Sequence, residues 1–426
     1  MGRSVSSSAT GAVRLLDLEL GQRPVAVLGG TREGRPYSRA QVLVRLHGTP
    51  LGCVEAPVED GYLDREALDR IVATALGDAI SAHLDADGGG PGSPPPRPLC
   101  LERHQRFLDT APPATVVVAT RDGERTLAEC LDSLQALDYP RYEIVVVDSA
   151  SRGGAIGPLA RGHDGRPTPV AYVREERPGL ALAHNRGLAA ANGSIIAFTD
   201  DDVIVDRLWL AQLAKGFEVA VDVACVTGAI LPLELETPAQ LWAEAYWGFG
   251  KGFERRVFDR RGPGERHIYP YAAGVFGSGA NMAFRTSVLR GLGGFDPALG
   301  TGSPARGGDD LACFFDIVSA GHRLVYEPTA LVRHRHRADY LSLRRQAYAY
   351  GSGLAAHVAR TVIEEPLRAL DVATRAPWGL AHVFSPASAK NVRRPPDFPP
   401  GLTRAERRGM AVGALAYLRA RRTRRC

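Results

Sequence analysis

Residues 194–210 constrain the fold more than any other stretch of this chain. They read SIIAFTDDDVIVDRLWL, so a short apolar run ends abruptly in Asp200, Asp201 and Asp202. Such a run is typical of a buried strand, and three adjacent acids at its end repel one another at low dielectric. A divalent cation removes this repulsion because hard cations prefer oxygen ligands. The stretch therefore predicts a strand that delivers carboxylates to a metal; the alternative is a solvated turn with a helix cap near Asp206.

The segments before this strand alternate between strand and helix patterns. Residues 115–119, 142–147 and 170–173 are apolar runs without alternation, separated by helical patterns. This predicts an α/β fold with a mostly parallel central sheet and helices on both faces. Ligands bind such sheets beyond the carboxyl ends of the strands, so Thr120, Asp148 and the acidic triplet are expected at one edge. No GxGxxG follows the first strand, which disfavours a dinucleotide-binding fold.

Composition divides the chain into four parts. Residues 1–86 carry one amphipathic helix pattern and predict a small α+β accessory domain, with short strands at 25–28, 41–46 and 50–56. Residues 87–98 read DGGGPGSPPPRP, which is too rich in glycine and proline for a core element and predicts a linker. The main domain is expected at 99–338. Residues 339–426 predict a helical C-terminal extension with a basic tail.

Charge and hydropathy narrow the partners. The 426-residue chain has a net charge of +5 and an apolar fraction of 45%, the composition of a globular protein with a sizeable core. The terminal arginines favour an anionic partner or surface, and not a nucleic acid. An apolar stretch at 410–418 precedes them, so we expect either peripheral membrane contact or a docked helix with a solvated tail. Neither a secretory signal nor a membrane-spanning run is evident, which predicts a cytoplasmic protein.

The six cysteines are scattered and form no CxxC pair. Their spacing therefore indicates neither a zinc site nor a disulfide framework. Reduced thiols in a cytosolic protein are the simplest interpretation, and the Ala/Arg/Gly-rich composition is typical of a bacterial protein. The cysteines are Cys53, Cys100, Cys130, Cys225, Cys313 and Cys426.

A second acidic motif lies far from the first in sequence. Asp309 and Asp310 follow two glycines and precede a helical apolar stripe, so they are expected at a helix N-terminus, where the macrodipole favours ionised carboxylates. An ionised carboxylate can take a proton from a hydroxyl within hydrogen-bond reach; helix capping is the alternative role. Asn281 lies in a glycine-rich segment and can hydrogen-bond sugar hydroxyls, with a glycine bulge as the alternative.

Five motifs occur in order along residues 114–353: VVVATRDGERTLAECLDSLQALDYPRYEIVVVDSAS, GLALAHNRGLAAANGSIIAFTDDD, GSGANMAFR, GGFDPALGTGSPARGGDDL and LVRHRHR. In this order they resemble the family 2 glycosyltransferases, which have the GT-A nucleotide-diphospho-sugar transferase fold. The resemblance implies metal-dependent, inverting transfer of a sugar from a nucleotide-diphosphate donor to an acceptor hydroxyl, with Mg or Mn as cofactor. Processive members carry a Gln-Arg-Trp signature and membrane spans; both are absent here, which favours non-processive transfer to a sugar, lipid-linked or small-molecule acceptor.

The resemblance also implies a role for each site residue. Of the three acids, Asp202 is the one that the resemblance implies as a metal ligand. His334 matches a position that completes the metal shell in some relatives. Asp310 is the implied catalytic base, with Asp309 and Asn281 on the acceptor side. Ser149 stands where many relatives carry an acid that reads uracil, so the nucleotide base is left open. The residues implied to border the donor are Ala119, Thr120, Asp148, Ser149, Asn185, Asp200 and Asp201.

Two other functions compete with this one. A nucleotidyltransferase on a similar sheet needs a lysine-bearing glycine-rich loop after the first strand, and residues 121–125 do not supply it. A non-catalytic sugar-nucleotide-binding protein would keep the donor-side residues and use Asp309 and Asp310 only structurally. Donor hydrolysis with and without Mg or Mn separates such a protein from an enzyme.

Overall fold

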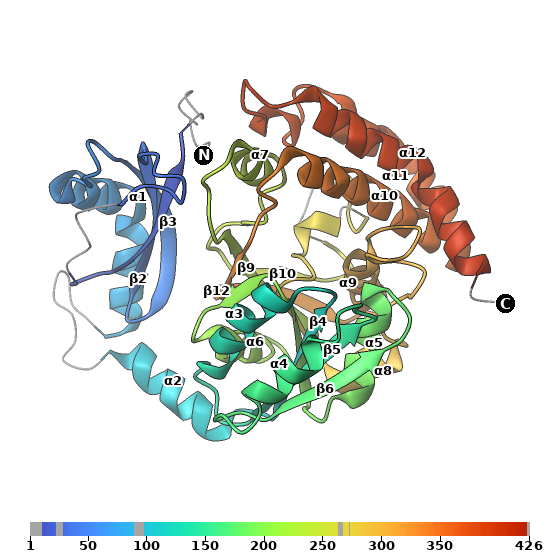
Figure 1. The fold of residues 1–426 in the computed structure, drawn as a ribbon, viewed down its shortest axis with the longest axis horizontal. Coiled ribbons are helices and arrows are strands. Elements are labelled where there is room, and N and C mark those ends of the chain that lie inside the picture. Colours follow the sequence, from blue (N-terminus) through green and yellow to red (C-terminus); the bar gives the residue numbers. More distant parts are fainter. Residues whose placement is uncertain (1–10, 23–28, 89–97, 263–266, 272, 424–426) are drawn as a thin grey trace.

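The computed structural model describes residues 11–22, 29–88, 98–262, 267–271 and 273–423 (Figure 1). Most of the predicted linker at 87–98 and the strand predicted at 25–28 lie outside these ranges. The predicted α/β class is confirmed, and both a small N-terminal α+β unit and a C-terminal set of helices are present. In Figure 1 the N-terminal unit lies beside the main domain, and the C-terminal helices cover the opposite side.

The N-terminal unit is a three-stranded sheet covered by one helix. Its strands are β1 (Val13–Glu19), β2 (Arg39–Leu46) and β3 (Thr49–Pro57), with β1 parallel to β2 and β2 antiparallel to β3. Helix α1 (Arg65–Ala86) begins where the Asp64 carboxylate accepts a hydrogen bond from the backbone N–H of Glu66 at 2.9 Å, a typical N-cap. Leu68 and Val72 of α1 pack onto the sheet and form its separate core.

The main domain is built on a nine-stranded sheet. Four neighbouring strands, β7, β4, β5 and β6, run parallel, as do β9 and β12, while β11 is antiparallel to β7 and β9 on either side of it. The mostly parallel sheet expected from the sequence thus carries an antiparallel insertion. The strand order is β10 (Arg256–Phe258), β12 (Arg323–His334), β9 (Val223–Pro232), β11 (Met282–Arg285), β7 (Ile195–Asp200), β4 (Ala114–Thr120), β5 (Tyr142–Ser149) and β6 (Val170–Glu175), with β8 (Val203–Val205) paired to β12.

Each face of the sheet packs against its own helices. Alternate residues of a strand point to opposite faces: Val116 and Val118 belong to one hydrophobic core, and Val117 and Ala119 to the other. The first core includes residues of α2 (Leu99–Thr110), α3 (Glu124–Gln135), α4 (Ile156–His163) and α6 (Trp209–Gly216). The second includes residues of α5 (Leu180–Ala190), α8 (Thr286–Gly291) and α9 (Asp309–Ser319).

The C-terminal extension packs as close helices. At Gly409 and Gly413 of α12 an added Cβ would lie 2.1 Å from the Tyr348 oxygen and 2.3 Å from the Ser352 oxygen of α10. Only glycine permits this approach, which sets α12 against α10. No helix within the described ranges combines the length and hydrophobicity that crossing a bilayer requires. The remaining elements are α7 (Pro238–Trp247), α10 (Tyr340–Glu364), α11 (Arg368–Phe384), α12 (Pro400–Arg422) and the short 3-10 helices at Ala273–Val275 and Asn391–Arg393.

Candidate active site

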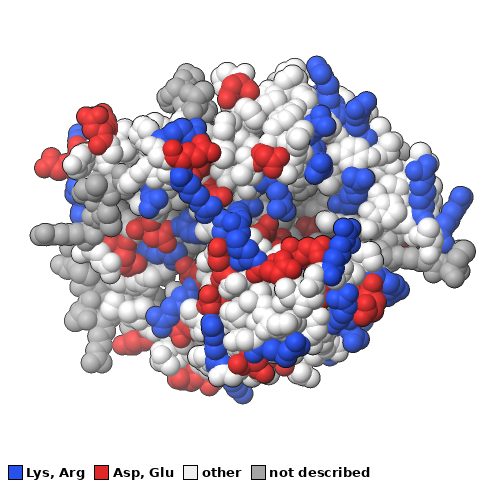
Figure 2. Space-filling view, viewed as in Figure 1, with Lys and Arg blue, Asp and Glu red and all other residues white. Residues whose placement is uncertain are grey.

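The predicted site residues begin at the carboxyl edge of the parallel strands. Thr120 of β4 lies in register with Asp148 of β5, and Ala119 lies in register with Asp200 of β7. Residues far apart in sequence therefore become lateral neighbours at this edge, as the rule for parallel sheets predicts. Figure 2 shows acidic side chains gathered in a hollow near the middle of this face, with basic side chains around it.

The acidic triplet is crowded and partly desolvated. Asp201 accepts a short hydrogen bond from the Thr120 hydroxyl, and a Cβ at Gly123 would lie 2.2 Å from the Asp201 carboxylate. Burial raises the pKa of Asp201 to about 6, although the Thr120 hydrogen bond opposes this. Burial, and then the charges of Asp202 and Asp201, raise the pKa of Asp200 well above its ordinary value. A cation at this edge would relieve both conflicts.

Asp200, Asp202 and His334 form a cluster that fits a divalent cation. One ligand atom from each lies within 4.8 Å of the others, and His334 Nε2 lies 3.4 Å from Asp202 Oδ1. The histidine arrives from the end of β12, whose antiparallel pairing with β8 sets it beside Val203. Burial lowers the pKa of His334 to about 4, so the imidazole is neutral at pH 7 and has a lone pair free. Two carboxylates and one neutral imidazole are a donor set suited to Mn or Mg.

Asp310 lies at the N-terminus of α9 and belongs to the same electrostatic environment. Its two carboxylate oxygens accept backbone N–H groups of Gly279 at 2.9 Å and Leu311 at 2.8 Å. Burial, and then the charge of Asp309, raise the pKa of Asp310 to about 6. The charges of Asp309 and Asp310 are also among the causes that raise the pKa of Asp200. The charges of the second acidic motif therefore act on the first.

A buried tyrosine of the C-terminal extension is affected by the charges of both motifs. The pKa of Tyr350, on α10, is raised by burial, and the carboxylates of Asp310, Asp200 and Asp202 add to the shift. Arg337, between β12 and α10, places Nη1 3.4 Å from Asp202 Oδ2. The charges of these carboxylates thus act on a side chain of the extension.

His184 is a site residue that the sequence interpretation missed. Its Nδ1 lies 3.6 Å from Asp309 Oδ2, and its ring packs on Phe198 and Phe295. Both ring nitrogens are buried and, among the described residues, accept or donate no hydrogen bond. The motif GLALAHNRG contains His184 directly before Asn185, and a role was predicted for Asn185 alone. His184 therefore lies between the carboxylate of Asp309 and the aromatic rings of the core.

Two residues of β5 that are predicted to border the donor, Asp148 and Ser149, form hydrogen bonds within the protein. The Asp148 carboxylate accepts from the Ser151 N–H at 2.8 Å, the Tyr172 hydroxyl at 2.9 Å and Arg174 Nη1 at 2.7 Å. Burial alone would raise the pKa of Asp148, but these partners hold it below its ordinary value. The Ser149 hydroxyl accepts from the Gly179 N–H at 3.2 Å. Both side chains remain at the predicted edge and fix the loops that border it.

Asn281 and Asn185 form hydrogen bonds to the protein in place of those expected to a ligand. The Asn281 amide is fully buried; it accepts from Trp209 Nε1 at 2.8 Å and donates to the carbonyl oxygens of Ala229 and Ala330. It offers no hydrogen to an acceptor sugar, so its expected acceptor-side position is corrected. Asn185 donates to the Phe295 oxygen at 2.7 Å and accepts from the Phe295 N–H at 2.8 Å. Asn185 therefore holds the loop after α8, and this contact uses one of its two amide hydrogens.

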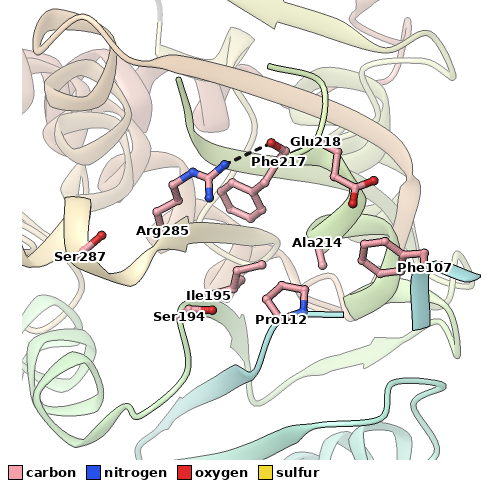
Figure 3. A pocket seen from close by; sticks show the side chains of 9 residues that line it. All are labelled: Phe107, Pro112, Ser194, Ile195, Ala214, Phe217, Glu218, Arg285 and Ser287. Atoms are coloured by element: carbon pink, nitrogen blue, oxygen red, sulfur yellow. Dashed lines mark hydrogen bonds between the residues drawn. The ribbon is translucent and has the colours of Figure 1, made fainter. Parts of the chain in front are cut away.

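A separate hollow of about 240 Å³ lies at the other end of β7 (Figure 3). Ser194 and Ile195 line it where this strand begins, whereas the acidic triplet lies where the strand ends. Figure 3 shows the Arg285 side chain bonded to the Phe217 backbone oxygen, at 3.2 Å. None of the predicted site residues lines this hollow, so it is distinct from the candidate active site.

Comparison with known proteins supports the interpretation of the main domain. Residues 115–290 match the family model described as glycosyl transferase family 2. The chain is 29% identical over 297 residues to the pre-mycofactocin glycosyltransferase of Mycobacterium tuberculosis, covering 69% of this chain and 54% of that protein. It is 24% identical over 231 residues to the glucosyl-dolichyl phosphate glucuronosyltransferase of Haloferax volcanii, covering 52% and 68%. The chain thus spans about half the length of the mycobacterial relative.

Two solved structures also align with the chain. The mannosyltransferase PcManGT from Pyrobaculum calidifontis, in complex with GDP-Man and Mn2+, is 22% identical, covers 81% of this chain and 84% of its own, and has a TM-score of 0.40. TarS 1-349 from S. aureus, in complex with UDP-GlcNAc, is 16% identical, covers 74% and 91%, and has a TM-score of 0.45. The family match includes the acidic triplet but ends before Asp310 and His334. The family match and the curated relatives agree with the motif order found in the sequence: residues 115–290 are similar to glycosyl transferase family 2.

Proposed function

We propose that this chain transfers a sugar from a nucleotide-diphosphate donor to an acceptor hydroxyl, in a metal-dependent reaction that inverts the anomeric centre. One observation carries the proposal. The start of α9 lies beside the end of β7: Asp310 accepts from the Gly279 N–H, and the next residue, Ala280, accepts from the Thr199 hydroxyl of β7 at 2.9 Å. The charge of Asp310 also raises the pKa of Asp200. A metal-binding group and a proton acceptor facing one site are what this transfer needs.

Asp202 and His334, with Asp200 beside them, are the residues that would hold the cation. When bound there, a divalent ion stabilises the negative charge that grows on the departing diphosphate. The chain's own part is to present neutral His334 and the two carboxylates within 4.8 Å of one another. Thr120 orients Asp201 toward the same edge, on the donor side of the site.

Asp310 is the proposed base. It is half-buried, and its backbone hydrogen bonds from Gly279 and Leu311 fix the carboxylate and leave lone pairs free. With a pKa raised to about 6, it is ionised at pH 7 and is a stronger base than an ordinary aspartate. A catalytic pKa near the working pH favours proton transfer. A single base serving an attack opposite the diphosphate supports inversion.

The donor side is formed by the backbone at Ala119 and by Thr120, Asp148 and Ser149. We assign no identity to the nucleotide base, because Ser149 is hydrogen-bonded to Gly179 and Asp148 to Arg174. Residues 293–308 lie between α8 and Asp309, and Asn185 binds one of them, Phe295. We infer that this loop excludes water from the site.

The acceptor is proposed to be a sugar, a lipid-linked molecule or a small molecule, with transfer that is not processive. The names of the two curated relatives each give a single acceptor, pre-mycofactocin for one and glucosyl-dolichyl phosphate for the other. That agrees with addition of one or a few sugars. Asp309, buried beside His184 next to the proposed base, is assigned to the acceptor side.

Peripheral membrane contact is proposed for the C-terminal extension, and α11 supports it more than α12 does. No residue of α11 is buried, and its apolar side chains Leu370 and Leu380 are 75% and 59% exposed. Trp378 and Phe384 lie exposed on the same helix. Co-sedimentation with anionic vesicles should fall in the double variant Leu380→Glu, Phe384→Glu. Unchanged co-sedimentation would remove the membrane from this proposal.

The central experiment is a screen of UDP-, dTDP- and GDP-sugars by thermal shift with Mn2+, followed by assays of transfer and donor hydrolysis with and without the metal. We expect one donor class to stabilise the protein only with metal, and to be hydrolysed or transferred. The anomeric coupling in the product reports inversion. Metal-dependent binding without turnover would indicate a non-catalytic binding protein instead.

A further inference from the structure

A second cluster of metal-ligating side chains lies where the N-terminal unit meets α2, far in sequence from the acidic triplet. His47, His83, Asp87 and Cys100 each offer one ligand atom, and these atoms all lie within 4.8 Å of one another. The side chains are largely shielded: His47 and His83 are 17% and 13% exposed, and Asp87 is 1% exposed. Imidazole, carboxylate and thiol together are the donors that zinc prefers.

Local structure brings the four residues together. His47 and Gly48 form the tight turn between β2 and β3, both with left-handed φ values of 53° and 77°, as a two-residue type I′ hairpin requires. His83 and Asp87 lie one turn apart at the end of α1, so they share a face of the helix. Cys100 lies in the first turn of α2. The negative end of the α1 dipole also favours a cation at this position.

Hydrogen bonding alone does not explain the contacts. His47 Nδ1 lies 2.9 Å from Asp87 Oδ2, 3.3 Å from His83 Nε2 and 3.5 Å from Cys100 Sγ. One ring nitrogen carries either one hydrogen or one lone pair, so it can make only one of these three contacts as a directed bond. A cation between the four atoms would instead use a lone pair from each of them.

The spacing of the atoms fits a tetrahedral zinc ion. With ordinary Zn–N, Zn–O and Zn–S bond lengths, neighbouring ligand atoms lie about 3.3 to 3.6 Å apart. Three of the four printed separations match: 3.3 Å for His47–His83, 3.5 Å for His47–Cys100 and 3.4 Å for His83 Nε2 to Asp87 Oδ2. The fourth, 2.9 Å from His47 Nδ1 to Asp87 Oδ2, is shorter and would lengthen on binding the ion. The other Asp87 oxygen accepts from the Cys100 N–H at 2.7 Å, an outer contact that orients the carboxylate.

We propose that the N-terminal unit holds a structural zinc ion between His47, His83, Asp87 and Cys100. The ion would fasten α2 to the end of α1 and to the β2–β3 turn. The other end of α2 places Phe107 and Leu108 in the core of the main domain, so the ion would fix the N-terminal unit relative to that domain.

The test uses the full chain, stripped with a chelator and titrated with Zn2+ against a chromophoric competitor. We expect one tightly bound zinc per chain in the wild type and in Asp202→Ala, which disables the active-site cluster. Cys100→Ser should weaken zinc binding at least about tenfold. Cys53→Ser, a half-buried cysteine of β3 outside the cluster, is the matched control and should bind as the wild type does.

Cobalt supplies a second readout that depends on the thiolate. Co2+ bound at this cluster should give a near-ultraviolet thiolate charge-transfer band in the wild type, Asp202→Ala and Cys53→Ser, and no such band in Cys100→Ser. If Cys100→Ser does not fold, His83→Gln takes its place in the zinc titration. A wild-type chain without the cobalt band, or a Cys100→Ser or His83→Gln variant with wild-type zinc affinity, would overturn the proposal.

Discussion

The two metal-ligand clusters of this chain differ in donor atoms and in how the chain assembles them. The active-site cluster takes two carboxylates from one strand end and a histidine from β12, whereas the N-terminal cluster takes four side chains from a turn and two helices. Oxygen-rich clusters suit Mg or Mn that assists a reaction, and a closed set with a thiol suits a structural zinc. Both clusters hold one buried residue among half-buried ones, so donor chemistry, and not burial, distinguishes a candidate catalytic metal site from a candidate structural one.

The largest expected effect falls on the active-site side of the comparison. Asp310→Asn should lower kcat at least about 100-fold, because a positioned base contributes that much or more, while donor affinity should stay unchanged. Steady-state rates and donor titrations measure both. Asp316→Asn on the same helix is the control: it breaks the ion pair to Arg360 at 2.8 Å and should affect stability, not the rate. Loss of donor binding in Asp310→Asn would contradict the role of a base.

The fold could be predicted largely because its signals are local. The apolar runs at β4, β5 and β7 and the helical stripes between them carry the parallel sheet, and the rule for strand ends placed Thr120 and Asp148 side by side. The antiparallel strand β11 was beyond the same reasoning. Its four residues, Met282–Arg285, pair with strands on both sides, and no local pattern distinguishes that from a parallel strand.

The site could be predicted only in part, because residue type does not show which way a side chain is used. Asn281 has the chemistry to bind a hydroxyl, yet it lies buried and bonded to Trp209 Nε1. The N-terminal cluster was invisible for a related reason. Spacing rules seek paired cysteines, while this cluster has a single cysteine, Cys100, and its closest partner in sequence, Asp87, lies across a glycine- and proline-rich stretch.

A crossover of metals and variants tests the comparison directly. A metal present at 100 times its Kd should add about 2.7 kcal/mol to the free energy of unfolding. Asp202→Ala should lose the stabilisation by Mn2+ and keep that by Zn2+, and Cys100→Ser should do the reverse. Thermal or denaturant unfolding measures all four combinations. Loss of both effects in one variant would mean that the clusters are not independent.

The smallest expected effect is a change in pH dependence that belongs to the active-site cluster alone. Asp310 must be ionised to accept a proton, and burial followed by the charge of Asp309 raises its pKa to about 6. kcat/KM should therefore fall as the pH drops through about 6. Asp309→Asn removes the like charge and should move this acid limb to lower pH. On the limb itself, the ratio of kcat/KM to its plateau value should then rise by less than about tenfold over the wild type.

The same raised pKa has the opposite sign for folding. A carboxyl whose folded pKa lies above its unfolded value of 3.8 stabilises the fold while it is protonated, and that contribution is lost as the pH rises through about 6. A fall in pH should thus lower the rate of transfer while protonation of Asp310 stabilises the fold. The loss of rate therefore cannot come from unfolding caused by Asp310.

The zinc content of the N-terminal cluster supplies a control. Asp309 is not part of that cluster, so the amount of bound zinc should not change in Asp309→Asn. An acid limb that stays in place, or zinc that is lost with it, would break the separation between the two clusters.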